Sequence, residues 1–343
     1  MITFKMTFKR AMGVGLAIGV VLVVGVLGWR TTFPPGPPEP LTIAIADTVL
    51  GVPLWAVERQ GFFVAEGLAV TLRHYASGQL ALEALLRGEA DVATVAETPI
   101  VFAALVGAPL RIIANFSTSS ETSVVARADR GINLASDLKG HRVGTAPGTT
   151  AHYYLHVLLS DYGLTDADVE LVPVPAGEQV AALAAGRVDA VAAFAPYSTQ
   201  CRLILGDNAR TFSAGLRYTG YGSLVAAPEF TRRRPAAALK LLRATDRGIL
   251  WLRGHPREAR AFAGATLGLA EPVVADAWNR LRPNLALDQG YIILLQAEAR
   301  WALAAHLVPA LVAGAPLPHF HDLIDSSALV RLHPDAVTVI AAP

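Results

Sequence analysis

The chain has 343 residues, of which 53% are hydrophobic and 17% are charged, and this length and composition suggest about two globular domains. The formal net charge of +1 gives no electrostatic reason to expect nucleic acid as a partner. Because the chain has a single cysteine, Cys201, an internal disulfide, a cysteine-based zinc site and an iron–sulfur site are excluded, and we expect no metal and no cofactor.

An uncharged apolar run, residues 11–29, follows three basic residues near the start of the chain. A run of this length can cross a bilayer, which takes roughly 17–25 residues, and the basic residues place its start in the cytoplasm. We assign residues 1–30 to this signal anchor or, alternatively, to a cleaved signal peptide. Either assignment puts the rest of the chain in the periplasm or on the outer face of the bacterial cytoplasmic membrane. The proline-rich residues 31–40 are expected to form an extended spacer.

Strands and helices are expected to alternate after this spacer. The pattern predicts a strand at residues 41–46, a loop at 47–52, a helix at 53–66 and a strand at 69–75, and then a helix and a strand within 82–99. Alternation of this kind is typical of a parallel sheet that helices cover on both faces.

The same order of elements recurs further along the chain. A strand is expected at residues 142–144, a helix at 150–162, a strand at 169–174, and a helix and a strand within 180–197. Residues 82–99 (LEALLRGEADVATVAETP) align without gaps with residues 180–197 (VAALAAGRVDAVAAFAPY). The glycine that ends each helix and the aspartate of each turn coincide in this alignment: Gly88 with Gly186, and Asp91 with Asp189.

A returning strand at residues 222–227 and helices at 236–253, 271–281 and 292–307 complete the predicted order. We therefore expect an α/β protein with two lobes, each a mainly parallel sheet flanked by helices. The first lobe is expected to take residues 41–127 and 222–343, and the second to take residues 128–221. Ligands bind beyond the carboxyl ends of such strands, so the two lobes would share one cleft.

Two long segments also carry a family resemblance. Residues 53–91 read PLWAVERQGFFVAEGLAVTLRHYASGQLALEALLRGEAD, and residues 137–153 read DLKGHRVGTAPGTTAHY. They resemble, in order, the G-F-F-x-x-E-G-L segment, the Ser-Gly loop, the L-x-x-G-x-x-D turn, the D-L-K-G-K-x-V-G-x-x-x-G segment and the S/T-x-A-H-Y helix start of one family. These are the ABC-transporter substrate-binding proteins for nitrate, aliphatic sulfonates, taurine and thiamine-pyrimidine precursors.

The resemblance implies the type II periplasmic-binding-protein fold and a solute-binding component of an ABC importer, which is not an enzyme. It also implies an ABC permease and its ATPase as partners, with attachment to the inner membrane through residues 11–29. One departure concerns the ligand: where the family often has Trp-Glu-Pro-Tyr, this chain has Phe194-Ala195-Pro196-Tyr197. The carboxylate and the indole are both replaced, so the resemblance does not name the ligand.

The candidate site is a set of loop and helix-start residues at the strand ends. Backbone N–H groups near Gly148–Ala151 and the hydroxyls of Thr149 and Thr150 would hold an anionic head group at the positive end of a helix. The equivalent first-lobe loop and a second helix start, with Gln79, would face the same cleft. The expected ligand-binding residues are Thr48, Leu50, Gly51, Ser77, Gly78, Glu97, Thr98, Gly148, Thr149, Thr150, Ala151, His152, Phe194 and Tyr197.

Two other functions fit the same fold. The ligand could be a heterocycle, such as a thiamine-precursor pyrimidine or another aromatic ring, stacked on Phe194, Tyr197, Tyr218 or Tyr221. The chain could also be a membrane-anchored sensor that signals to a partner. His152 and His156 lie one helical turn apart, but no H-E-x-x-H pattern contains them, and we expect no metal there.

Overall fold

The computed structural model describes residues 37–214, 218–308 and 316–340. The predicted membrane or signal segment, residues 11–29, and most of the predicted spacer lie outside these ranges. Among the helices that the structure describes, none has both the length and the apolar character that a membrane crossing requires.

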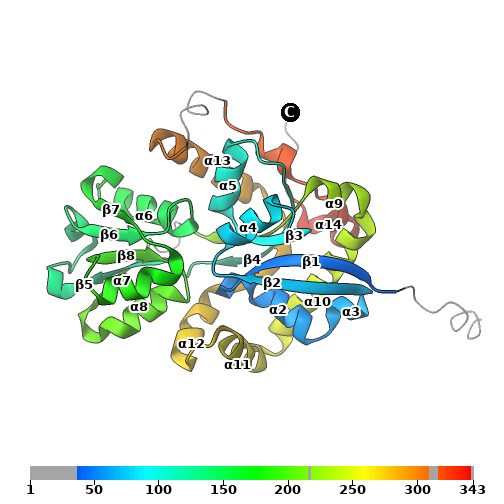
Figure 1. Ribbon diagram of the computed structural model, residues 1–343, viewed down its shortest axis with the longest axis horizontal. Coiled ribbons are helices and arrows are strands. Elements are labelled where there is room, and N and C mark those ends of the chain that lie inside the picture. The colour runs from blue at the N-terminus through cyan, green and yellow to red at the C-terminus, as the bar shows by residue number, and fades with distance from the viewer. Residues whose placement is uncertain (1–36, 215–217, 309–315, 341–343) are drawn as a thin grey trace, which may run out of the picture. The chain divides into compact units, whose positions relative to one another are not determined.

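A six-stranded sheet forms the centre of the first lobe (Figure 1). Its strand order is β11-β4-β10-β3-β1-β2. Strands β1 and β3 are parallel, and β10 runs antiparallel to both β3 and β4. Buried β-branched and aliphatic side chains dominate these strands, as expected for a sheet covered on both faces. The strands are β1 (Glu39–Ala46), β2 (Leu68–Tyr75), β3 (Val92–Ala96), β4 (Arg111–Ser119), β10 (Gly220–Ala226) and β11 (Leu281–Ala286).

A five-stranded sheet forms the second lobe, with the order β7-β6-β8-β5-β9. Strand β6 is parallel to β7 and β8, whereas β5 is antiparallel to β8 and β9. The strands are β5 (Ser123–Arg127), β6 (Arg142–Thr145), β7 (Glu170–Pro173), β8 (Ala190–Ala193) and β9 (Ala209–Phe212). The two-lobed α/β fold predicted from the sequence is confirmed, but both sheets are mixed and not mainly parallel, because β10, β11 and β5 form antiparallel pairs.

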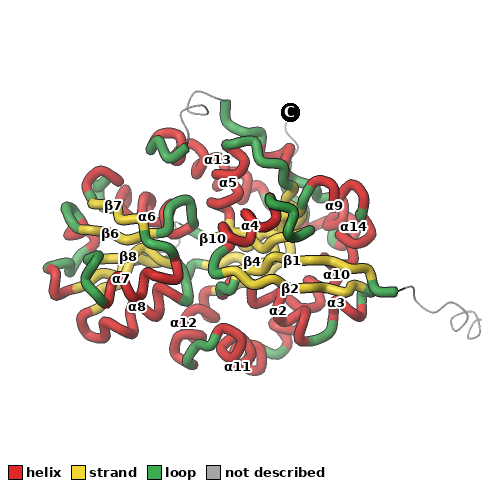
Figure 2. The backbone as a smooth tube through the Cα atoms, in the orientation of Figure 1, coloured by secondary structure: helices red, strands yellow, loops and turns green. Residues whose placement is uncertain are grey.

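Helices cover both faces of each sheet (Figures 1 and 2). In the second lobe, α6 packs on one face, and α7 and α8 pack together on the other. In the first lobe, α4, α5 and α13 lie on one face, and α2, α3 and α10 lie on the other. The helices of the lobes, excluding short single turns, are α2 (Val52–Arg59), α3 (Phe62–Ala65), α4 (Gly78–Leu86), α5 (Glu97–Leu105), α6 (Thr150–Asp161), α7 (Gln179–Ala184), α8 (Tyr197–Leu205), α9 (Pro228–Arg233), α10 (Pro235–Gly254), α11 (Pro256–Leu267), α12 (Glu271–Arg280), α13 (Gln289–Ala304) and α14 (Ser327–Leu332).

The helix predicted at residues 53–66 is divided in two. Helix α2 ends at Arg59, and α3 begins at Phe62, after Gly61 with a φ of 69°. A left-handed residue interrupts the helical hydrogen-bond ladder, and glycine adopts that conformation at little cost. The helical tail also does more than wrap the first lobe, because α12 packs against α8, and Arg202 and Asp276 form an ion pair of 3.1 Å there.

Two crossover segments connect the lobes. Residues 120–122 lead from β4 to β5, and residues 213–219 lead from β9 to β10, of which 215–217 are not described. The sequence-based boundary assigned residues up to 127 to the first lobe, whereas β5 pairs with β8 and β9 of the second. No local pattern separates this short strand from its neighbours, because only its partners far along the chain decide which sheet it joins.

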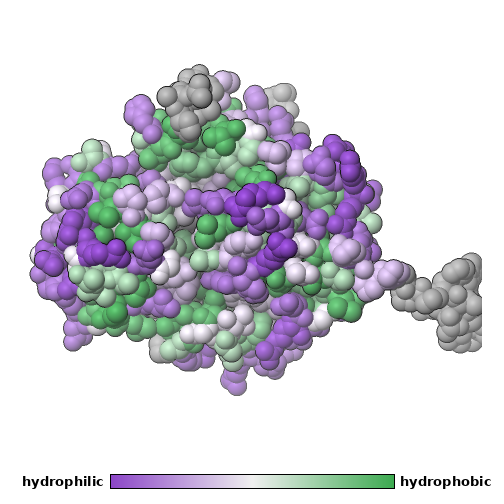
Figure 3. Space-filling view, viewed as in Figure 1, coloured by the Kyte–Doolittle hydropathy of each residue, from purple (hydrophilic) through white to green (hydrophobic). Residues whose placement is uncertain are grey.

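Two hydrophobic clusters stabilise the lobes. The larger one surrounds the six-stranded sheet and continues onto α6 and one face of the second sheet, and the smaller one lies on the other face of that sheet, around Val125, Leu183, Val191 and Cys201. Hydrophilic and hydrophobic residues are interspersed over the face shown in Figure 3.

Candidate ligand-binding site

A cavity between the lobes is lined by residues of both lobes and of the first crossover. The cavity is small. The centres of water molecules have about 40 Å³ available to them, which is room for a few waters. The first lobe contributes Ala46, Thr48, Leu50, Gly51, Ser77, Gly78, Gln79, Thr94, Val95, Ala96, Pro99, Phe116, Ser119, Gly220 and Gly222; the second lobe and the first crossover contribute Glu121, Thr122, Thr149, Thr150 and Phe194.

The start of α4 forms one wall of this cavity. Ser77 is the extended N-cap residue, and its Oγ accepts a hydrogen bond of 3.3 Å from the Leu80 N–H. A Cβ atom at Gly78 would lie 3.1 Å from the Ala96 nitrogen and 3.2 Å from the Val95 Cα, so glycine allows the helix to approach β3 closely. The first N–H groups of a helix have no partner within it. Those of Gly78 and Gln79 are therefore available at the cavity.

The start of α6 forms the opposite wall. Thr149 is the N-cap residue in extended conformation, but its hydroxyl donates to the Ala146 carbonyl at 2.7 Å and does not cap the helix. The helix ladder begins with the His152 N–H, which donates to the Thr149 carbonyl at 2.9 Å. The N–H groups of Thr150 and Ala151 precede that bond, at the positive end of the helix dipole.

A third turn closes the cavity from the first lobe. The single-turn helix η1 (Val49–Gly51) follows Thr48, which is buried. The Leu50 carbonyl accepts a hydrogen bond of 3.3 Å from the Ser117 hydroxyl on β4. A Cβ at Gly51 would lie 2.5 Å from the Ala46 carbonyl oxygen, so only glycine fits this tight return from β1.

The cavity is nearly neutral in charge. Among the described residues that line it there is no Lys, Arg or His, and the one ionisable side chain is the carboxyl of Glu121. Burial, and secondly the charge of Glu97, raise the pKa of Glu121 to about 7. Backbone N–H groups at helix starts are thus the main donors available to a ligand here, and they suit an anion that must later be released.

A protein-family model described as NMT1/THI5 like matches residues 52–259, which is more than half of the chain. The chain belongs to the NMT1/THI5-like family. The match covers all of the second lobe and the two helix starts that line the cavity.

Curated proteins and solved structures similar to this NMT1/THI5-like chain include solute-binding proteins. A putative aliphatic sulfonates-binding protein of Escherichia coli is 28% identical over 211 residues, which are 61% of this chain and 66%, just under two thirds, of that protein. The taurine-binding periplasmic protein of E. coli is 22% identical over 72% of each chain. The alkanesulfonate-binding protein SsuA of Xanthomonas axonopodis, solved with bound MOPS, has the same fold, with a TM-score of 0.73, 22% identity, and coverage of 85% of this chain and 99% of that one.

Eight of the predicted ligand-binding residues of this NMT1/THI5-like protein line the cavity. They are Thr48, Leu50, Gly51, Ser77, Gly78, Thr149, Thr150 and Phe194. The other six predicted residues do not line it: Glu97, Thr98, Gly148, Ala151, His152 and Tyr197. Whether the eight contact a ligand stays a prediction.

Glu97 and Thr98 were expected at a strand tip, and that expectation is wrong. Strand β3 ends at Ala96, and Glu97 begins helix α5, where both side chains are fully buried. The Glu97 carboxylate accepts hydrogen bonds from the Thr150 hydroxyl (3.1 Å to Oε1) and the Tyr221 N–H (2.7 Å to Oε2), and also from the Tyr218 hydroxyl. It therefore faces the junction of the lobes.

The remaining predicted residues support the helix starts from behind or from the rim. Gly148, with a φ of 72°, donates its N–H to the Nδ1 of His152 at 3.3 Å. His152 is buried against Trp301 at a ring distance of 5.0 Å, and burial lowers its pKa. The Tyr197 hydroxyl donates to the Ala76 carbonyl of the first lobe at 3.4 Å, so this side chain bridges the lobes.

Sequence reasoning missed the polar residues of the first crossover. Ser119, Glu121 and Thr122 line the cavity and are buried. Ser119 is the last residue of β4, and Glu121 and Thr122 belong to the crossover; all three lie in the run STSSETS, residues 117–123. A run of small polar residues usually indicates an exposed loop, and the signal that distinguishes this one is that a strand pairing in a different sheet follows it directly.

Proposed function

We propose that this chain is the extracytoplasmic solute-binding component of an ABC importer. Its ligand would be a small anion with a sulfonate-type head group, held between the two lobes. One observation carries the proposal: two helix starts, at Ser77 and Thr149, meet from opposite lobes at a cavity whose lining contains no cation. Converging N–H groups at two positive helix ends bind a single negative charge without a salt bridge.

The relatives support the same class of ligand. Two relatives from E. coli are named as a sulfonates-binding and a taurine-binding protein, and a sulfonate head group is one that this cavity would suit. A periplasmic location follows from that kinship and from the basic and apolar start of the chain. An ABC permease and its ATPase would be the partners, and the predicted segment at residues 11–29 would hold the protein at the inner membrane.

Capture would depend on closure of the lobes. A ligand that contacts both helix starts does so only when the lobes are together, so it shifts the open–closed equilibrium by its different affinity for the two states. The permease would then recognise the closed form.

A stacked heterocycle has less support than an anion. Of the aromatic residues considered for stacking, Phe194 lines the cavity. Tyr218 is buried, with its ring 5.9 Å from that of Tyr153, and Tyr221 packs on Tyr291 at 4.9 Å. Phe116 adds a second ring to the lining, but its side chain is fully buried in the core below.

A thermal-shift series with the full chain in mild detergent tests the ligand class. The probes are MOPS, taurine, nitrate and an aminopyrimidine. Because a ligand stabilises the state that it binds, MOPS or taurine at a hundred times its dissociation constant should add about 2.7 kcal/mol to the free energy of unfolding. Stabilisation by the pyrimidine and not by either sulfonate would overturn the anion assignment.

Two substitutions at one residue isolate the backbone donor. Thr150→Val removes the hydroxyl and keeps the N–H, whereas Thr150→Pro removes both and suits the first position of a helix after an extended residue. Thr150→Pro should bind the sulfonate at least about tenfold more weakly than Thr150→Val, since a hydrogen bond to a charged group contributes about 1.5–3 kcal/mol. Equal affinities would show that this N–H is not a ligand contact.

We also propose that the chain is not an enzyme. Among the described residues that line the cavity there is no Cys, His or Lys, and burial raises the pKa of the Cys201 thiol to about 12, so that thiol is not an activated nucleophile. The fold by itself does not decide this, because one fold hosts many functions. Chemical conversion of a bound sulfonate, followed by mass spectrometry over hours, would overturn this part of the proposal.

A further inference from the structure

The carboxyl group of Glu97 lies where the two lobes and both crossovers meet. Thr150, at the start of α6, belongs to the second lobe. Tyr218 belongs to the crossover that returns to the first lobe, and Tyr221 to the strand that follows it. All three donate to Glu97, which is itself fully buried at the start of α5.

Two more buried carboxyls surround Glu97. Glu298 on α13 is fully buried, and the hydroxyl of Thr98 on α5 is near enough to lower its pKa. Glu121 lies on the other crossover, in the cavity wall. The charge of Glu97 raises the pKa of both, although burial is the larger cause for each.

The groups around these carboxyls do not neutralise them. The phenols that face them are Tyr153 of α6, Tyr218, Tyr221 and Tyr291 of α13, and burial is the first cause that raises the pKa of each. Asp288 is a further negative group, 3.5 Å from the Tyr221 hydroxyl. Among the described residues, Arg280 is a cation on this side, and it donates to the Ser120 carbonyl at 3.4 Å and pairs with Asp276 at 3.5 Å.

We propose that Glu97 is a positioning residue for lobe closure. Its carboxylate holds the α6 start of the second lobe to the first lobe through Thr150, and closing the cleft around Glu97, Glu121 and Glu298 takes up a proton. The described residues supply no cation paired with these three neighbouring buried carboxyls, which cannot all be ionised in the closed form. Burial raises the pKa of Glu97 as well, but its three donors act in the opposite direction, and its charge raises the pKa of both neighbours.

The direction of the pH effect follows from hydration. In an open form, water reaches the crossover carboxyl of Glu121 and returns its pKa towards 4.5, whereas in the closed structure the pKa is about 7. The closed form therefore binds more protons, and its population falls as pH rises from about 4.5 to 7. This inference deepens the proposed function and rests on it for the meaning of closure.

Distances between two spin labels measure closure without any solute. Val64 on α3 and Leu134 in the second lobe are exposed, and Val64→Cys with Leu134→Cys gives one label per lobe, while the buried Cys201 stays unlabelled. In the full chain, the ratio of short to long distances should fall about tenfold or more between pH 5.5 and 8. Glu121→Gln should remove most of this fall. An unchanged pH profile in Glu121→Gln would overturn the proton uptake.

The bond from Thr150 is tested in the same label pair. Thr150→Val should lower the closed ratio about fivefold at both pH values, and Thr150→Ser, which keeps the hydroxyl, should restore it. In a Glu97→Gln background, Thr150→Val should change the ratio less than twofold, because the two residues act through one contact. Equal effects of Thr150→Val in both backgrounds, or no rescue by serine, would overturn the positioning role. Because no sulfonate is present, these outcomes do not depend on whether the chain binds one.

Discussion

The two lobes share one plan of strands. In each sheet, a central parallel strand lies between two others, and an antiparallel strand follows: β2-β1-β3-β10 in the first lobe and β7-β6-β8-β5 in the second. The register is also the same, because Ile43 lies opposite Val92 in one lobe and Val143 opposite Ala190 in the other. The repeat seen in the sequence is therefore a repeat of backbone geometry.

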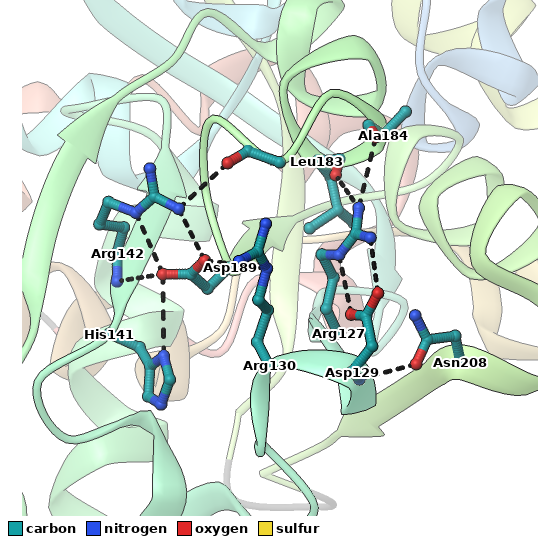
Figure 4. Close-up of polar contacts among 10 residues, drawn as sticks. Arg127, Asp129, Arg130, His141, Arg142, Leu183, Ala184, Asp189 and Asn208 are labelled. Atoms are coloured by element: carbon teal, nitrogen blue, oxygen red, sulfur yellow. Dashed lines mark hydrogen bonds and ion pairs between the residues drawn. The ribbon is translucent and has the colours of Figure 1, made fainter.

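Equivalent aspartates differ in how strongly they are held. Asp91 accepts a hydrogen bond of 2.8 Å from the Thr42 N–H, and Asp189 accepts one of 3.1 Å from the Arg142 N–H, each at the start of the adjoining strand. Asp189 also binds the Arg142 guanidinium at 2.8 Å, with Arg130 and His141 nearby (Figure 4). Its side chain is 9% exposed, against 36% for Asp91. The second lobe therefore holds its equivalent aspartate through more polar contacts than the first lobe does.

The largest effect should separate these two aspartates. Asp189→Ala leaves the Arg142 N–H and guanidinium without their acceptor, and we expect a loss of about 3 kcal/mol in the free energy of unfolding. Asp91→Ala should cost about 1 kcal/mol, because its ion pair with Arg234 is longer (3.4 Å) and more exposed. Urea unfolding of both variants measures the difference. Equal losses would show that the network around Asp189 adds no stability beyond the shared backbone bond.

The lobes also differ where their third strand ends. In the ungapped alignment Glu97 corresponds to Ala195, and both are fully buried. The first lobe thus carries a carboxylate at the point where the second has a methyl group. The repeat thus accounts for the strands and helices that both lobes share. The contact between Glu97 and Thr150 of the other lobe involves a residue that the second copy lacks.

Glu97, which the second copy lacks, helps to raise the pKa of Glu121 on the first crossover. This asymmetry therefore predicts that the stability of the protein depends on pH. A carboxyl with a raised pKa in the folded state binds extra protons there, so stability is lost as pH rises from about 4.5 to 7. Between pH 5 and 8, Glu121 should account for about 2 kcal/mol of that loss, at 1.36 kcal/mol per pKa unit.

Glu121→Gln removes this ionisation and keeps the shape of the side chain. Its urea-unfolding free energy should fall less between pH 5 and 8 than that of the unchanged protein. Glu178→Gln is the control, because Glu178 is an exposed acid of the second lobe. Parallel profiles for Glu121→Gln and the unchanged protein would contradict the prediction.

How much the sequence reveals depends on whether the signal is local. The glycines and aspartates of the repeat are local signals, and they predicted the turns around Gly88 and Gly186 correctly. The strand predicted within residues 82–99 ends at Ala96, and Pro99 lies in the first turn of α5, where proline is well accommodated. The partners of Glu97 lie 53 and 124 residues away, so no spacing could have indicated them.

The same distinction applies to the candidate site. Helix starts have a sequence signature, and the loops at Ser77 and Thr149 were found from it. The crossover residues Glu121 and Thr122 have none, because their burial results from two lobes packing around them. The local sequence thus predicted the helix starts that line the cavity. Tertiary packing placed Glu121, the ionisable residue of the described lining, in the cavity wall.

A smaller effect should come from the first helix cap. Ser77 caps α4 through its hydroxyl, whereas the corresponding residue of the second copy, Pro175, has no side-chain cap. Ser77→Ala should lower the free energy of unfolding by about 1 kcal/mol, the usual cost of a lost N-cap. Pro175→Ala should cost less than about 0.5 kcal/mol. A thermal melt of each variant without ligand checks this, and an equal cost for the two would remove this difference between the copies.

The smallest difference is expected at the paired glycines. Gly88 and Gly186 end their helices with φ values of 76° and 68°, so alanine at either position is strained by about 1 kcal/mol. A Cβ at Gly88 would meet nothing within 4 Å, and one at Gly186 would lie 3.1 Å from the flexible end of Arg130. Because that end is about half exposed and can move, Gly88→Ala and Gly186→Ala should agree within about 0.5 kcal/mol in urea unfolding. A much larger loss for Gly186→Ala would mean that Arg130 is held in place by the Asp189 network, and the two copies would then differ in their turns as well as in their ion pairs.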